Sequence, residues 1–269
     1  MTLIRVIRIT LLLTVFFVMA FYAKTQKLKS RSWSAPLEVV IYPINGDNGS
    51  PVVAAYIKNL DNQVFEPLDD FFRRESLRYS IITSQPTITR LGSAMTEQPP
   101  VSPAVDSGFA SIIWWGIKFR YWAFQNTPDD ESNLHRVRVF VHYHEALEGR
   151  KLQHSLGLDK GLLAVVHAFA EIDQDQQNNV VIAHEILHTV GATDKYGSNG
   201  EPVFPAGYAA PEKQPLYPQT EAEIMAARIP LSPNTSRMAA SLAECMVSPA
   251  TAAEINWMKQ EPGTVAAND

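Results

Sequence analysis

Hydrophobic positions near the N-terminus form an uncharged, strongly apolar run from Ile9 to Ala23, bounded by Arg8 and Lys24. The run is short for a membrane-spanning helix, which needs about 20 apolar residues. Basic side chains at its two ends can reach back to the lipid surface, however, and allow residues 5–22 to span. A basic start followed by an apolar run is also typical of a secretory signal sequence. We favour an uncleaved membrane anchor.

The chain is therefore divided into a signal-anchor or transmembrane segment with a linker, residues 1–31, and one domain, residues 32–269. The polar stretch 24–36 predicts the linker. Four basic residues follow the apolar run and two arginines precede it, so charge alone leaves the orientation open. We expect the domain on the periplasmic or extracellular side of the membrane.

Short apolar or alternating runs predict the strands of this domain. They are rich in β-branched residues, and turn residues or prolines bound the first of them; they lie at Leu37–Tyr42, Thr87–Leu91, Arg136–His144 and Leu162–Ala170. The third run alternates, which places four of its residues on one face, namely Val137, Val139, Val141 and Tyr143.

The segments between these strands have apolar residues at helical spacing. Ser50 and Pro51 predict a helix start, and the periodicity continues to Leu77 with a break near Pro67. Residues 107–124 predict a helix that is apolar over much of its surface, followed by a polar turn over 127–133. The order of strands and helices predicts an α/β fold with a mixed, twisted sheet.

Composition narrows the range of functions. The chain is 46% hydrophobic and 19% charged, as expected of a globular protein. Its net charge of −5 provides no basic surface for nucleic acid. Cys245 is the only cysteine, so neither an intrachain disulfide nor a paired-cysteine metal site can form. We interpret it as a small buried apolar residue.

The segment Asn178–Val190 carries the chemistry, because it contains the pattern H-E-x-x-H at His184, Glu185 and His188. On a helix, histidines four residues apart project from one face and can bind the same zinc ion. Glu185 then lies beside the metal as the general base for a water molecule. Asn178 or Asn179 is the expected helix cap.

The flanking residues strengthen this interpretation. Gly191 can end the helix with a positive φ, and Asp194 follows closely enough to offer a carboxylate as third ligand. Apolar residues predict that the helix face away from the metal packs in a core: Val180, Ala183, Leu187 and Val190.

The extended pattern H-E-x-x-H-x-x-G-x-x-D resembles the metzincin clan of zinc peptidases, in the variant with Asp as third ligand found in snapalysin-type enzymes. The resemblance covers roughly residues 160–260. It implies a strand before the active-site helix, a methionine turn below the metal, for which Met225 is the candidate, and a C-terminal helix, which Ser248 and Pro249 would open.

One departure from the clan concerns the oxyanion. Some members place a tyrosine two residues after the methionine, where this chain has Ala227. Tyr196 is a candidate substitute for an oxyanion or substrate contact, although packing of the loop also explains it. If Asp194 is not the third ligand, Glu221 or Glu223 is the alternative.

The remaining histidines and the proline-rich stretch have simpler interpretations. His142 and His144 share a strand face and could in principle form a second metal site, but we expect hydrogen-bonded structural histidines there and at His154 and His167. The proline-rich stretch 197–220 predicts an ordered loop that forms a wall of the substrate cleft.

The sequence thus predicts a zinc-dependent endopeptidase that acts on protein or peptide substrates, with Zn²⁺ as cofactor and a membrane anchor. Two alternatives stay open. One is a non-catalytic envelope scaffold or binding protein with the same fold, and the other is a hydrolase of a non-peptide amide.

Overall fold

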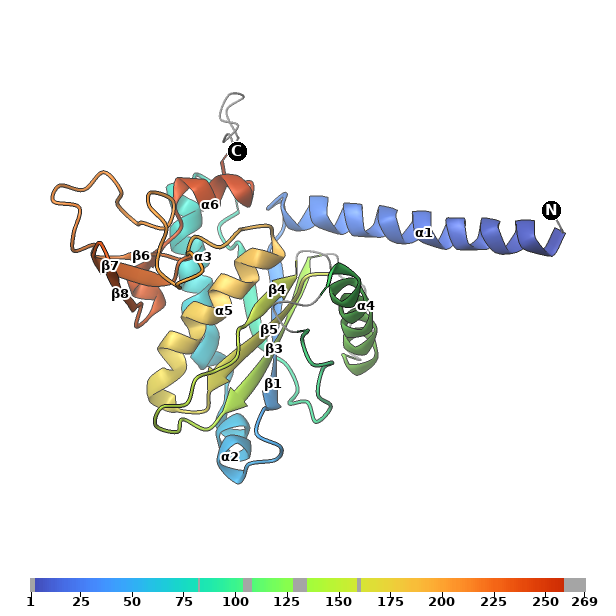
Figure 1. The fold of residues 1–269 in the computed structure, drawn as a ribbon, viewed down its shortest axis with the longest axis horizontal. Coiled ribbons are helices and arrows are strands. Elements are labelled where there is room, and N and C mark those ends of the chain that lie inside the picture. The colour runs from blue at the N-terminus through green and yellow to red at the C-terminus, as the bar shows by residue number, and fades with distance from the viewer. Residues whose placement is uncertain (1–2, 82, 104–107, 128–134, 159–160, 259–269) are drawn as a thin grey trace.

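A computed structural model describes residues 3–81, 83–103, 108–127, 135–158 and 161–258 (Figure 1). Its centre is a five-stranded sheet in the order β2-β1-β3-β5-β4. The strands are β1 (Leu37–Asn45), β2 (Thr87–Leu91), β3 (Arg136–His144), β4 (Leu156–Leu158) and β5 (Leu163–Phe169). Four strands are parallel and the edge strand β4 is antiparallel to β5. The predicted mixed α/β fold is therefore confirmed.

Helices cover both faces of this sheet. The helices of the domain are α2 (Pro51–Asn59), α3 (Glu66–Arg78), α4 (Phe109–Asn126), α5 (Asp175–Thr189) and the short α6 (Pro249–Glu254), with 3₁₀ turns at Asn62–Phe65, Ile172–Gln174 and Leu242–Glu244. Alternate residues of a strand point to opposite faces. Val139 therefore belongs to the core under α3 and α5, whereas Phe140 belongs to the core under α4.

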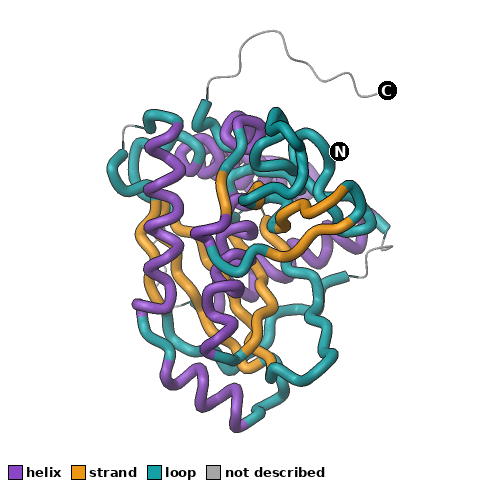
Figure 2. The backbone as a smooth tube through the Cα atoms, turned by 90° about the vertical axis from the view of Figure 1, so that its left-hand side faces the viewer, coloured by secondary structure: helices purple, strands orange, loops and turns teal. Residues whose placement is uncertain are grey.

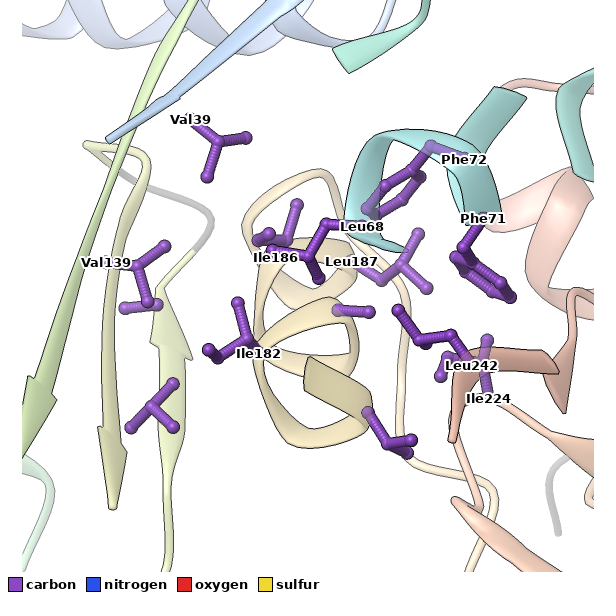
Figure 3. Packing of buried hydrophobic residues seen from close by; sticks show 14 of the residues in the cluster. Val39, Leu68, Phe71, Phe72, Val139, Ile182, Ile186, Leu187, Ile224 and Leu242 are labelled. Atoms are coloured by element: carbon purple, nitrogen blue, oxygen red, sulfur yellow. The ribbon is translucent and has the colours of Figure 1, made fainter. Parts of the chain in front are cut away.

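The helix α5 is buried on nearly all sides. Ile182 and Ile186 face Val39 and Val139 of the sheet, while Leu187 faces α3 and the C-terminal segments (Figure 3). A helix surrounded by protein in this way needs apolar residues around its whole circumference. The position of the H-E-x-x-H segment is consequently fixed by the core of the domain.

A second, four-stranded sheet follows α5 in the chain and has the order β8-β7-β6-β9. Its strands are β6 (Ala222–Glu223), β7 (Arg228–Ser232), β8 (Thr235–Met238) and β9 (Cys245–Met246). Figure 2 shows it as short strands within the loop-rich part of the molecule. Cys245 is buried and free, as expected.

Several local predictions are confirmed in detail. The hydroxyl of Ser50 accepts a hydrogen bond from the Val53 backbone N–H and caps α2. Pro67 lies in the first turn of α3, where its missing N–H costs nothing. The hydroxyl of Ser248 caps α6 in the same way as Ser50 caps α2.

Other predictions are wrong in their boundaries. The first strand continues beyond Tyr42 to Asn45, and the active-site helix begins at Asp175, so Asn178 and Asn179 lie inside it. Their amides bind distant backbone groups instead: Asn178 pairs with Phe169 at the end of β5, and Asn179 donates to Val64. Residue 107 and most of the turn over 127–133 lie outside the described residues.

The predicted linker over 24–36 is also wrong in its first part, because the helix α1 extends from Leu3 to Ser30. Lysine, glutamine and leucine are good helix formers, and neither glycine nor proline occurs before Pro36. Gln26 and Ser30 are buried against the domain, which stabilises these last turns. Among the described residues, α1 is the one helix long and apolar enough to cross a membrane.

Candidate metal centre

The helix α5 carries His184, Glu185 and His188, and the first two of these line a cleft between the segment before β4 and residues of the second sheet. The helix ends at Thr189, and Gly191 follows with φ +99°. This left-handed conformation suits glycine and turns the chain back within a few residues. Asp194 thereby reaches the two imidazoles, as the sequence predicts.

Three ligand-type atoms converge here. The Nε2 atoms of His184 and His188 are 3.0 Å apart, and each lies 3.1 Å from Oδ1 of Asp194. Tetrahedral ligands about 2.0–2.1 Å from zinc lie roughly 3.3–3.4 Å apart. The three atoms therefore form a triangle of nearly the size that a zinc ion requires.

Backbone carbonyls fix the orientation of both imidazoles. Nδ1 of His184 is 3.0 Å from the oxygen of Ile224, and Nδ1 of His188 is 2.9 Å from the oxygen of Ala192. Carbonyl oxygens only accept, so each Nδ1 carries the hydrogen and a neutral ring turns the lone pair of its Nε2 toward the other ligands. Two such lone pairs and a carboxylate oxygen repel one another unless a cation or proton lies among them.

The charged groups around the two histidines also favour a cation at this site. Burial lowers the pKa of His188, but the carboxylates of Asp194 and Glu185 outweigh this effect and raise the pKa overall. Partial burial alone would raise the pKa of Asp194, but its contacts with the two histidines and the positive charge that these can carry hold that pKa far below its usual range. The site thus stabilises positive charge near the three converging atoms.

Glu185 lies beside the two histidines. It is buried, and its Oε2 atom has no hydrogen-bond partner among the described residues. A carboxylate oxygen of Glu185 lies within 4.8 Å of the ligand nitrogens of both His184 and His188. Burial raises the pKa of Glu185, which increases its affinity for a proton.

Asp194 fits the third ligand position better than the alternatives from the sequence. Glu223 is fully buried, and its carboxylate accepts hydrogen bonds from Met225, Ser248 and Thr251. Glu221 is exposed. Asp194 lies beside the two histidines, whereas the Glu223 carboxylate is bound to groups in the turn at Met225 and at the start of α6.

The turn at Met225 supports both ligand-bearing segments through its backbone. The Ile224 oxygen accepts from His184, and the Met225 oxygen accepts from the N–H of Lys195, next to Asp194. The Met225 side chain is fully buried in the main core. Ala227 ends this turn with φ +55° and lines the cleft.

Tyr196 lies at the site. Its ring stacks at 6.1 Å from that of His184, measured between ring centroids, and it lines the cleft. Burial and the adjacent Asp194 carboxylate, to which its hydroxyl donates, raise the pKa of Tyr196. The hydroxyl therefore stays protonated and remains a hydrogen-bond donor.

The cleft has a volume of about 340 Å³. Its walls include His154 and His167, for which the sequence predicted only structural roles, together with Gln153 and Ser155 before β4. Gly200, which belongs to the proline-rich stretch 197–220, also lines the cleft, where the sequence predicts a wall formed by this stretch. The signal for His167 was available, because it is the one polar residue of an otherwise apolar strand.

Three of the other histidines, His142, His144 and His167, lie in contact with one another. Nδ1 of His144 is 2.8 Å from Asp47, and its Nε2 is 3.0 Å from Nδ1 of His167. The His142 ring lies beside that of His167, with Nε2 unpartnered among the described residues. Within the described residues, these histidines form no group of three side chains with ligand atoms close enough to share a metal, so no second metal cluster is found.

Comparison with known proteins gives no further assignment. No protein-family model matches the chain, and no curated protein matches it significantly. The function of the protein is consequently inferred from the geometry of the site.

Proposed function

We propose that this protein is a zinc-dependent endopeptidase, anchored to a membrane by α1 with its catalytic domain outside the cytoplasm. The observation that carries the proposal is the convergence of His184 Nε2, His188 Nε2 and Asp194 Oδ1 within 3.0–3.1 Å of one another. Glu185 beside them is buried, and a purely structural zinc site has no need of such a base.

The residues present suit zinc in number and kind. Two imidazoles and one carboxylate are a ligand set that leaves a fourth position open. When bound, zinc would supply Lewis acidity toward a carbonyl oxygen and lower the pKa of water at the site. Glu185 would take the proton from that water and deliver it to the leaving amine, a role favoured by its raised pKa.

A peptide substrate is supported by the strand beside the site. In the five-stranded sheet, β4 is the edge strand, and Gly157 at its centre lies directly against Glu185 and His188. An edge strand offers unpaired backbone groups to an extended peptide. A peptide paired to β4 would pass Glu185, and the Tyr196 hydroxyl would donate to the developing oxyanion after releasing the Asp194 carboxylate.

The test separates the base from the ligands. We expect Glu185→Gln to keep one zinc per chain and the fold but to lose nearly all peptide turnover. Asp194→Ala should instead weaken zinc binding itself. Elemental analysis and digestion of a broad peptide library measure the two effects. Full zinc affinity and activity in Asp194→Ala would exclude the proposed ligand set, and a zinc-loaded wild type without turnover would favour the scaffold alternative.

The anchor and its orientation have a separate test. We expect the full-length chain to fractionate with membranes and the domain to be cleaved by protease added to the non-cytoplasmic side. Complete protection there, with cleavage only from the cytoplasmic side, would reverse the proposed orientation and leave the chemistry of the site untouched.

A further inference from the structure

The helix α4 has two apolar sides. One side packs on the sheet, where Trp115, Phe119 and Ala123 are buried in a core with Phe140 and Tyr42. Rings of Phe119 and Phe140 meet edge to face at 5.7 Å. This side accounts for the attachment of α4 to the domain.

The opposite side of α4 is apolar and faces solvent. Its residues follow one another at helical spacings of three or four positions and include Ile113, Trp114, Ile117, Tyr121 and Phe124. Trp114 is 60% exposed and Phe124 is 72% exposed. A contiguous apolar surface of this kind marks an interaction site more often than chance exposure does.

Basic residues border this surface. Helical spacing places Lys118 along one edge of it and Arg120 along the other, and α4 contains no acidic residue. Lys118 also lies over the Trp114 ring, 6.0 Å from its centroid. An apolar face bordered by lysine and arginine, with tryptophan and tyrosine on it, is typical of a helix lying in a lipid interface.

The direction of α1 is consistent with a lipid surface as the partner of α4. In Figure 1, α4 lies at the margin of the domain on the side toward which α1 projects, and it runs across the direction of α1. The residues that follow α1 attach it to the domain. The Arg31 side chain donates to the backbone oxygen of Glu254, and the Trp33 indole N–H donates to the backbone oxygen of Ile255. Trp33 and Trp257 also pack edge to face, with ring centroids 5.3 Å apart.

We propose that α4 lies flat in the headgroup region of the same bilayer that α1 crosses. The inference rests on the proposed membrane anchor. The exposed apolar face would enter the boundary between headgroups and acyl chains, while Lys118 contacts lipid phosphates. Lys24, Lys27 and Lys29 follow the apolar run of α1 and supply further positive charge for anionic lipids at this level.

This arrangement places the metal centre away from the lipid. α4 covers one face of the sheet and α5 covers the other, so the sheet separates the bilayer from His184 and His188. Substrates of the proposed peptidase would therefore reach the cleft from the aqueous phase. Two attachment points, α1 and α4, would hold the domain in one orientation on the membrane.

The experiment uses the full-length chain in vesicles of phosphatidylcholine and phosphatidylglycerol. Single cysteines at Ile117 and Tyr121 carry nitroxide labels, and accessibility to oxygen is compared with accessibility to a water-soluble nickel complex. Val52 on α2 is the matched aqueous control, since it is 56% exposed and Ile117 is 52% exposed. Wild type is the labelling blank, because Cys245 is buried.

We expect the ratio of oxygen to nickel accessibility at Ile117 and Tyr121 to exceed that at Val52 several-fold. A ratio equal to that at Val52 would overturn the inference. Low accessibility to both reagents, with dipolar broadening between labels, would overturn it in favour of a second copy of the chain. A label at Val15 of α1 tests the anchor separately: lipid exposure at Val15 without it at Ile117 refutes the α4 contact alone.

Discussion

Glu254 of α6 lies 2.8 Å from the ammonium nitrogen of Lys195, the residue that follows Asp194. The same carboxylate accepts from the backbone N–H of Thr193, the residue before Asp194, at 2.8 Å. It thus holds the chain on both sides of the proposed third ligand. Neither contact involves the metal site itself, so Glu254 is a positioning residue.

Removing this support should weaken zinc binding while all three ligands remain. We expect Glu254→Gln to lower zinc affinity about 10–100-fold, the usual effect of losing a partner that orients a metal ligand. Competition with a chromophoric chelator measures the affinity. Glu244→Gln is the matched control, because the Glu244 carboxylate also pairs with a basic residue, Arg237, but makes its contacts with Arg237 and Ala240 and not with the segment that carries Asp194. Equal losses in both variants would contradict a specific role for Glu254.

Gly157 is predicted to tolerate no side chain. A Cβ there would lie 2.5 Å from the Glu185 backbone oxygen and equally close to Cβ of His188. Gly157→Ala must therefore push β4 away from α5, at a cost of about 1–3 kcal/mol of unfolding free energy, and should reduce peptide turnover.

The control for this prediction is Gly116→Ala in α4. Its added Cβ meets the flexible end of the Arg120 side chain, and alanine favours a helix interior by about 1 kcal/mol over glycine. Chemical denaturation should show opposite signs for the two variants. A stable, fully active Gly157→Ala protein would mean that β4 does not press against the site.

Met225 should act through its backbone. Its carbonyl and that of Ile224 hold the segments carrying Asp194 and His184, while its side chain fills the core. Met225→Leu conserves volume and both carbonyls, so we expect a stability loss below about 1.5 kcal/mol and one zinc per chain. Elemental analysis that finds no zinc in a folded Met225→Leu protein would show that the side chain itself matters to the metal.

Acid should destabilise the domain through buried histidines. Burial, with the nearby histidines, lowers the pKa of His142 to about 3 and that of His167 to about 4. Their stabilising contribution is present above the unfolded-state pKa of about 6.5 and is lost as pH falls from there toward the folded-state values. Each histidine adds a slope of up to about 1.4 kcal/mol per pH unit in this window.

His142→Phe keeps an aromatic ring and removes the titrating group. We expect a shallower decline of unfolding free energy between pH 6.5 and about 4, measured by denaturant titration with EDTA present so that metal release makes no contribution. A slope equal to that of the wild type would show that His142 titrates alike in the folded and unfolded states.

The amino-acid sequence by itself determined the features that depend on spacing within one element. The four-residue interval between His184 and His188 fixes them on one face of α5, and Gly191 can adopt the positive φ that returns the chain toward Asp194. Alternation in Arg136–His144 fixes which strand residues enter the main core. Each of these follows from backbone geometry over a few residues, which no distant contact needs to supply.

The tertiary structure alone decided which distant groups meet. Only the path of the chain after α5 shows that Glu223 binds Ser248 and Thr251, which leaves Asp194 as the carboxylate beside the histidines. The approach of Gly157 to Glu185, and of His167 to the cleft, depends on how β4 and β5 lie in the sheet. Contacts of this kind arise from packing between elements far apart in the chain, and local spacing contains no information about them.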